Sequence, residues 1–444
     1  MRETRNAQAS IFDFYSEHEK GRELQRLSAL LDEERDLLGL VERDFHCDEA
    51  SRTGALGLSI ESIFRCLLLK TMTGMSYRAL SFVLSDSQSY RSFARLRGGE
   101  SPSRSALQAS VRRVSAETLA AINQRMMSRW VEACGLSLAQ VRIDSTVVDS
   151  AIAAPSDSQL LNDGVRVLSR LMSKSQSATG VKVRFVDQRA RAKSLAFRLF
   201  HAKKAEKDRL YPQLLGVVAV TLRQTGKALE RVRHEGSDGA QRWMSDVAHY
   251  RALLSKVIDQ TQRRVFNDER VPVSEKLVSL FEPHTDILVN GRREVRYGHK
   301  VNLATQDDGF ITYANIEMGN PADKTLYLPV IEACSNDFDC QPMATVADGS
   351  YASQANVTAA RALGVKRVVF HKRVGLSYHQ MGVKKKTFDA LKRFRAGIEG
   401  NISELKRAFG LARVTWKGLE GFKAYVWSAV LSYNLVRMAR FSSA

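Results

Sequence analysis

The sequence predicts an α/β protein in which a long helical segment interrupts the sheet and an all-helical region precedes it. Three observations support this interpretation. Short alternating segments rich in β-branched residues occur at 141–148 and again from residue 284 onwards, and such alternation is typical of strands. The residues before and between them carry apolar side chains at helical spacing. The 444 residues are 44% hydrophobic, enough for two or three domains with buried cores.

The charge balance indicates the class of partner. The formal net charge is +19 and the isoelectric point is about 9.8, which favours a polyanion, either nucleic acid or an anionic membrane surface. Apolar runs such as LLGVVAV at 214–220 are far shorter than the roughly 20 residues of a membrane-spanning helix, and the first residues lack the apolar segment of a signal peptide. The five cysteines form no CxxC pair, so zinc-finger spacing is absent and reduced thiols are expected. We therefore expect a cytoplasmic protein that binds nucleic acid and no membrane.

The N-terminal third reads as helical. Residues 1–58 form a segment that could dock or dimerise, and residues 59–138 a helical domain. Within the latter, 59–96 breaks at TGMS, where Ser76 could cap the next helix, and 101–135 opens with Ser and Pro. Short helices studded with arginine suit a helix-turn-helix-like DNA reader, although an ordinary small helical bundle fits the pattern equally well.

The first predicted strand, VRIDSTVV at 141–148, contains Asp144. Residues 156–282 then read as a helical insertion that is dense in Lys and Arg. The strands return in three alternating segments, 284–290, 294–306 and 309–319, with turns expected at NGR (290–292) and QDDG (306–309).

The remaining predicted elements alternate between helix and strand. They are a helix at 322–335, a strand at 343–348, a helix that ends at Gly364, a strand at 365–370 and a long C-terminal helix. With the insertion removed, the order is strand, strand, strand, helix, strand, helix, strand, helix, which is a ribonuclease H-like α/β order. The catalytic core would then combine 139–155 with 283–444.

Three acids fall on elements that such a fold brings together. Asp144 lies inside the first strand, Asp348 ends the strand at 343–348, and Glu399 lies on the C-terminal helix. Ligands of α/β sheets gather near the carboxyl ends of strands. Three carboxylates there could hold two divalent cations about 3.5–4 Å apart, which activate an oxygen nucleophile and stabilise a leaving oxygen. Hard oxygen ligands suit Mg²⁺ or Mn²⁺. Alone, Asp144 could be an edge or cap residue and Asp348 a turn residue, so the combination carries the hypothesis.

The helix LKRFRAGIEGNISELKRAFG places Arg395 one turn before Glu399 and Lys406 about two turns after it, all on one face. Arg395 and Glu399 could be an ordinary i,i+4 pair worth roughly 0.2–0.5 kcal/mol. However, Gly397 and Gly400 beside Glu399 each cost a helix about 1 kcal/mol relative to Ala. Because glycine lets another backbone or a ligand approach closely, the pattern indicates a site.

Other candidate groups rank lower. Asp149 should face away from Asp144, Asp323 looks like a helix N-cap, and Glu404 lies about 140° around the helix from Glu399. The histidines resemble no zinc site, and plain polar contacts are the favoured roles of two of them. These two are His299, in a predicted strand, and His371, which follows VVF.

The chain resembles a DDE transposase of bacterial insertion sequences. The matching residues are IDST at 143–146, VADGSY at 346–351, and R-x3-E-x6-K formed by Arg395, Glu399 and Lys406. The last motif resembles the YREK signature, with Lys392 at the position of its tyrosine. The stretches FEPHTDILVNGRREVRYGHKVNL and FRAGIEGNISELKRAFGL are most similar to the ISNCY group.

This resemblance implies roles for individual residues. Asp144, Asp348 and Glu399 would bind two Mg²⁺ or Mn²⁺ ions, and Arg395 and Lys406 would contact DNA phosphates near the scissile bond. The cations cannot hold a metal, but they can clamp a phosphate.

The resemblance also implies an activity: nicking double-stranded DNA at terminal inverted repeats and joining the freed 3′-hydroxyl to target DNA. The N-terminal helices would recognise the repeats, and the insertion would add phosphate contacts. Family analogy implies a homodimer on DNA, in a bacterial cytoplasm and associated with the nucleoid. A ribonuclease H-like nuclease without strand transfer and a catalytically silent DNA-binding protein remain as alternatives.

Overall fold

The computed structural model describes residues 3–5, 14–45, 57–290, 294–371 and 376–441. It divides into two compact units, one formed by 1–150 with 298–444 and the other by 151–297. Each unit is described by itself. The turn expected at NGR falls largely outside the described residues.

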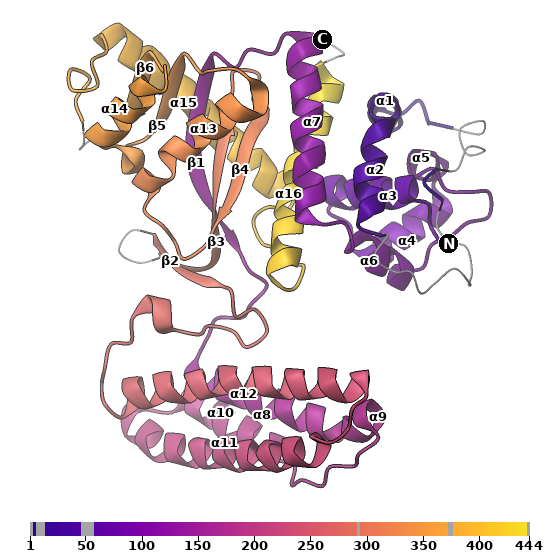
Figure 1. The fold of residues 1–444 in the computed structure, drawn as a ribbon, viewed down its shortest axis with the longest axis vertical. Helices are drawn as coiled ribbons and strands as arrows, with labels where there is room; N and C mark the ends of the chain where they lie inside the picture. Colours follow the sequence, from indigo (N-terminus) through magenta and orange to yellow (C-terminus); the bar gives the residue numbers. More distant parts are fainter. Residues whose placement is uncertain (1–2, 6–13, 46–56, 291–293, 372–375, 442–444) are drawn as a thin grey trace. The chain divides into compact units, whose positions relative to one another are not determined.

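The N-terminal part of the first unit is helical, as the sequence predicts. Its α-helices are α1 (Glu19–Glu33), α2 (Leu38–Arg43), α3 (Ile60–Thr73), α4 (Tyr77–Asp86), α5 (Gln88–Phe93), α6 (Arg104–Val111) and α7 (Ala116–Cys134) (Figure 1). The expected break at TGMS is confirmed. Gly74 ends α3 in the left-handed conformation with φ 65°, and the Ser76 hydroxyl caps α4 by accepting from the Ala79 N–H at 3.1 Å.

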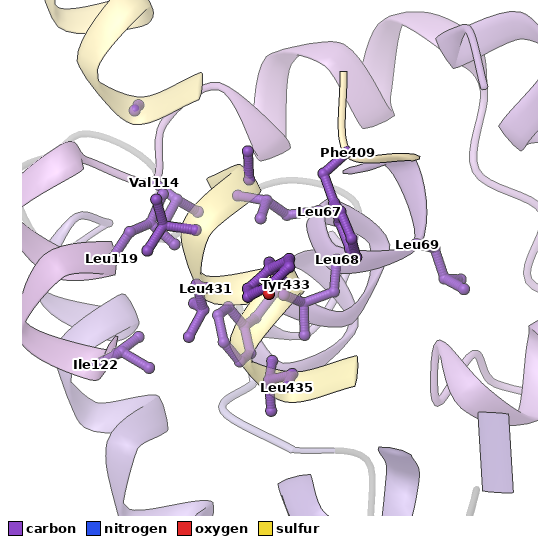
Figure 2. Close-up of a cluster of buried hydrophobic side chains, with 14 of the residues drawn as sticks. Leu67, Leu68, Leu69, Val114, Leu119, Ile122, Phe409, Leu431, Tyr433 and Leu435 are labelled. Atoms are coloured by element: carbon purple, nitrogen blue, oxygen red, sulfur yellow. The ribbon is translucent and has the colours of Figure 1, made fainter. Parts of the chain in front are cut away.

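The last helix, α16 (Leu419–Phe441), is buried along most of its length. Figure 2 shows its residues Leu431 and Leu435 among side chains of α3 and α7, including Leu68 and Leu119. The same hydrophobic cluster includes Val301 of the sheet. The N-terminal helices therefore share a core with the C-terminal helix and the sheet.

The sheet is mixed, and its path runs β2-β3-β1-β5-β6 with β4 paired to β3. The strands are β1 (Gln140–Asp149), β2 (Asp286–Asn290), β3 (Glu294–Thr305), β4 (Ile311–Glu317), β5 (Ala344–Asp348) and β6 (Arg367–His371). The pairs β1–β3 and β3–β4 are antiparallel, whereas β1–β5 and β5–β6 are parallel. The strands predicted at 284–290, 294–306 and 309–319 correspond to β2, β3 and β4. Together with β1 they make four strands before α13 (Tyr327–Phe338) in the described chain, one more than the three of the expected ribonuclease H-like order.

Helices cover both faces of the parallel part of the sheet (Figure 1). On one face, α13 (Tyr327–Phe338) and α14 (Gln354–Ala362) pack over Ile143 and Phe370. On the other, α15 (Lys385–Ala408) packs through Leu391 on Val346 and Val369. Since successive strand residues point to opposite faces, the even-numbered residues of β1 and β5 face α15.

The second unit is built from long helices packed side by side (Figure 1). They are α8 (Asp157–Ser173), α10 (Arg189–His201), α11 (Lys204–Val232) and α12 (Asp238–Val265), with the short α9 (Ser175–Thr179) between the first two. Their apolar stripes form a separate core that includes Leu161, Leu214, Trp243 and Leu254. Helix α11 continues through Pro212, and the break between α10 and α11 lies at Ala202 and Lys203.

Candidate active site

Two of the predicted acids lie on neighbouring parallel strands. In the β1–β5 register, Ile143 pairs with Ala347, so Asp144 and Asp348 are the next residue along each strand. Both are even-numbered and face α15. Asp348 is the last residue of β5, which places the pair where the parallel part of the sheet ends.

Helix α15 brings the third acid to this edge through one arginine. The Arg395 guanidinium lies 3.5 Å from Asp144 Oδ2, 3.4 Å from Asp348 Oδ1 and 3.0 Å from Glu399 Oε1. The three carboxylates come from three elements far apart in the sequence, yet they share one guanidinium. The arrangement is a concentrated acidic site held together by a single internal cation.

Solvent exposure rises across the three acids. The side chain of Asp144 is 19% exposed, that of Asp348 38% and that of Glu399 65%. Burial raises the pKa of Asp144 to about 6. Arg395 and the Ser145 N–H, which donates to Asp144 Oδ1 at 2.8 Å, oppose that rise, and the other two acids add to it. Charge on Asp144 is therefore costly unless a cation stays close.

The donor chemistry suits a hard divalent cation, but the side chains are not arranged around one. Within the described ranges, no group of three or more His, Cys, Asp or Glu residues lies close enough to hold a metal ion. The acids contact Arg395 instead. Carboxylate oxygens remain the ligands that Mg²⁺ and Mn²⁺ prefer, so these residues fit the metal by type and would need side-chain movement to bind it.

A buried arginine of β1 connects the sheet to α15 through hydrogen bonds. Arg142, two residues before Asp144 on the same face of β1, donates to the Phe394 carbonyl at 3.1 Å and to Asn401 Oδ1 at 3.2 Å. Its Nε donates to Thr305 Oγ1 of β3 at 2.8 Å. A Cβ atom on Gly397 would lie 2.6 Å from Arg142 Cζ, which real Cβ contacts do not allow. Gly397 is thus required by a side chain of the same protein.

The network continues from α15 into α16. Asn401 Nδ2 donates to the Tyr433 hydroxyl at 2.7 Å, and that hydroxyl donates to the Gly309 carbonyl at 3.1 Å. In contrast, a Cβ on Gly400 would meet nothing within 4 Å. The two glycines beside Glu399 therefore differ: one makes room for Arg142, and the other faces open space.

Sequence reasoning missed this supporting network. One signal was available, because Arg142 is a charged residue that alternates onto the same strand face as Asp144. Its partners Asn401 and Tyr433 gave none, since only the folded chain brings them within reach.

The other predicted residues occupy different environments. Lys406 is half-buried on α15. His371 is half-buried at the end of β6, opposite Asp348 in the register, and burial followed by Lys392 and Arg395 lowers its pKa. Lys392, at the signature's tyrosine position, therefore lies close enough to the site to act on His371.

The lower-ranked groups have partners elsewhere. Glu404 pairs with Arg440 at 3.4 Å, and His299 is fully buried with its ring 4.8 Å from that of Phe422. Asp149 ends β1 beside the backbone of residues 412–414, where its N–H donates to the Ala412 carbonyl.

The N-cap expected at Asp323 is wrong. Asp323 begins a short 3₁₀ turn before α13 and accepts from Lys300 Nζ at 2.7 Å.

Two segments of the chain match known protein families. Residues 284–435 match the family model of the transposase DDE domain, and residues 12–113 match a second model, the transposase domain DUF772. Both matches are transposase domains. They support a DDE transposase as the class of this chain. No curated protein and no solved structure matches it.

The DDE-domain match covers only part of the candidate site. It contains Asp348, Arg395, Glu399 and Lys406, whereas Asp144 precedes it. The transposase matches also leave out the helices of 156–282. Every helix in the described residues is too short or too polar to cross a lipid bilayer.

Proposed function

We propose that this chain is a transposase that cleaves DNA at the terminal inverted repeats of its own element and joins the freed ends to target DNA. The observation that carries the proposal is the meeting of Asp144, Asp348 and Glu399 at one guanidinium. The DDE-domain match includes two of these acids. We further propose that its catalytic core is ribonuclease H-like, that the chain belongs with the ISNCY group, and that Arg395, Glu399 and Lys406 form its YREK-like signature.

Asp144, Asp348 and Glu399 would hold Mg²⁺ or Mn²⁺, because they offer carboxylate oxygens at the end of a sheet. When bound, a pair of such ions activates the attacking oxygen and stabilises the leaving oxygen of a phosphodiester. The chain contributes three acids of graded exposure. Asp144 would hold the metal from a fixed position in the sheet, whereas the exposed Glu399 side chain has room to change rotamer and move toward the metal.

Arg395 would have two successive partners. Without metal, its guanidinium neutralises the acids and keeps their mutual repulsion low. Once the carboxylates have cationic partners of their own, the guanidinium can turn to the scissile phosphate, which it can bind through two parallel hydrogen bonds. Lys406, farther along α15, would contact a neighbouring phosphate as a point charge.

The N-terminal helices would recognise the repeats, and a homodimer on DNA would bring two ends together. The basic insertion would add contacts that do not depend on sequence. These roles rest on the DUF772 match, on the net charge of +19 and on the resemblance to DDE transposases.

Incubation of the full chain with its element's own end DNA and Mg²⁺ or Mn²⁺ tests the proposal. Nicked ends and joined products are the expected result. Nicking without joining would favour a nuclease, and binding without either product would favour a catalytically silent DNA-binding protein.

A further inference from the structure

Helix α10 of the second unit presents two phenylalanines to solvent. Its buried side consists of Ala192, Leu195, Ala196 and Leu199, which follow helical spacing. Phe197 and Phe200 lie on another side of the helix, and their side chains are 67% and 75% exposed. The helix therefore has an aliphatic stripe that is buried in the core and, on another side, aromatic side chains that face solvent.

The two exposed rings form one aromatic surface with a histidine. The His201 ring is 4.8 Å from that of Phe197 and 5.0 Å from that of Phe200, both in edge-to-face arrangement. Leaving a phenylalanine in water forgoes about 1.5–3 kcal/mol of burial free energy. Single exposed apolar residues are ordinary, but contiguous ones mark interaction sites. We call Phe197, Phe200 and His201 the aromatic surface.

The charge around the aromatic surface indicates its partner. Lys and Arg outnumber Asp and Glu by more than three to one over residues 182–209. Lys193, one helical turn before Phe197, is exposed, as are Lys203 and Lys204 just after the helix. Lysine is depleted at the centre of protein–protein interfaces, whereas aromatic rings set among basic side chains are typical of proteins that bind single-stranded nucleic acid.

We propose that the aromatic surface of α10 binds unpaired DNA bases by stacking, with the surrounding lysines on the phosphates. A phenylalanine ring has no hydrogen-bonding atom, so it can contact neither phosphates nor base edges through hydrogen bonds. It can stack on a base face, and duplex stacking hides most of those faces. Single-stranded or locally opened DNA is therefore the ligand that fits. This inference rests on the proposed function for the identity of the polyanion, and it goes further by assigning a binding surface and a DNA form.

The test measures DNA binding by fluorescence anisotropy, with the full chain in metal-free buffer. The ligands are a labelled thymidine oligonucleotide, the same oligonucleotide with abasic sites, and a duplex. For the Phe197→Ala/Phe200→Ala double variant we expect affinity for the thymidine oligonucleotide to fall about tenfold or more. Affinity for the abasic oligonucleotide should stay unchanged, because it offers no base to stack on. The variant should fold normally, since alanine is the better helix former.

The matched control is Phe266→Ala, which removes an exposed phenylalanine at the end of α12 in the same unit and should bind all three ligands normally. Equal affinity of the wild type and the double variant for the thymidine oligonucleotide would overturn the proposal. So would an equal loss on the abasic oligonucleotide. If light scattering showed instead that the double variant changed only the oligomeric state, the surface would bind a second copy of the chain. None of these results depends on cleavage, so failure here is distinct from failure of the proposed function.

Discussion

Gly397 of α15 lies against the guanidinium of Arg142 from β1, and the missing Cβ is what lets the two meet. Through this contact Arg142 reaches the Phe394 carbonyl and Asn401, so the strand that carries Asp144 also sets the position of the helix that carries Glu399. The glycine that weakens the helix locally is thus explained by packing within the protein.

Replacing Gly397 with Ala should therefore destabilise the protein. The added methyl group overlaps Arg142, and overpacking of this kind costs about 1–3 kcal/mol. Gly400→Ala is the matched control, because its Cβ meets nothing within 4 Å and removal of a helical glycine stabilises by roughly 0.5–1 kcal/mol. Denaturant unfolding of both variants measures the difference. Equal stability of the two would show that Arg142 is not held as described.

The acids should be essential for cleavage but dispensable for folding. Asp144→Asn, Asp348→Asn and Glu399→Gln should each lower single-turnover cleavage of end DNA by about a thousandfold or more, since under the proposed function each change would remove a charged ligand of the metal site. DNA binding should remain. Glu404→Gln, on the same helix but paired with Arg440, should cleave normally. An acid variant that keeps wild-type cleavage would remove its residue from the site.

Replacing Arg395 should lower the stability of the protein most when no metal is bound. In Arg395→Gln the three acids lose their shared cation, so the metal-free protein should melt at a lower temperature than the wild type, and added Mn²⁺ should restore more of its stability. If Arg395 also clamps the phosphate, cleavage should fall by about tenfold to a thousandfold, or roughly 1.4–4 kcal/mol of transition-state stabilisation.

Arg393→Gln controls for the loss of a positive charge on the exposed side of α15 and should change neither property. The variant Lys406→Gln should lower cleavage over the same range as Arg395→Gln. An unchanged melting temperature and full activity in Arg395→Gln would mean that its three ion pairs are incidental.

The N-terminal helices are best tested in the full chain. A fragment ending near residue 140 would lack α16, whose Leu431 and Leu435 fill the core beside α3 and α7 (Figure 2). Exposed arginines Arg78 of α4 and Arg104 of α6 are suitable probes. If these helices read the repeats, their joint replacement by Gln should lower affinity for end DNA by about tenfold, as expected from losing two phosphate or base contacts. Arg22→Gln on α1 should bind like the wild type, and an equal loss in that control would argue against a local reading surface.

Local pattern predicted most of the elements. Strand alternation located β1, a short apolar run located β5, and serine capping located the start of α4. Because these elements are set by residues close in sequence, Asp144 and Asp348 could be placed before the fold was known. Their common contact with Arg395 agrees with that placement, while their catalytic role stays a prediction.

Long-range contacts explain what the sequence could not predict. Glycines beside Glu399 suggested a close approach, but nothing local could tell a ligand from the Arg142 side chain far upstream. Similarly, Asp323 resembled an N-cap, yet its carboxylate accepts a hydrogen bond from Lys300 of β3. Alternation did predict the short strand β2 at 284–290, but the expected order of elements counted only three strands before the first helix, and the described chain has four.

The central claim is that the three acids catalyse strand transfer and not hydrolysis alone. The most direct measurement supplies end DNA already cut to a free 3′-hydroxyl, together with Mn²⁺ and a supercoiled target plasmid, to the wild type and to Asp348→Asn. The account predicts a joined product with the wild type and none with the variant. A joined product from both proteins, or release of nicked plasmid without joining by the wild type, would contradict it.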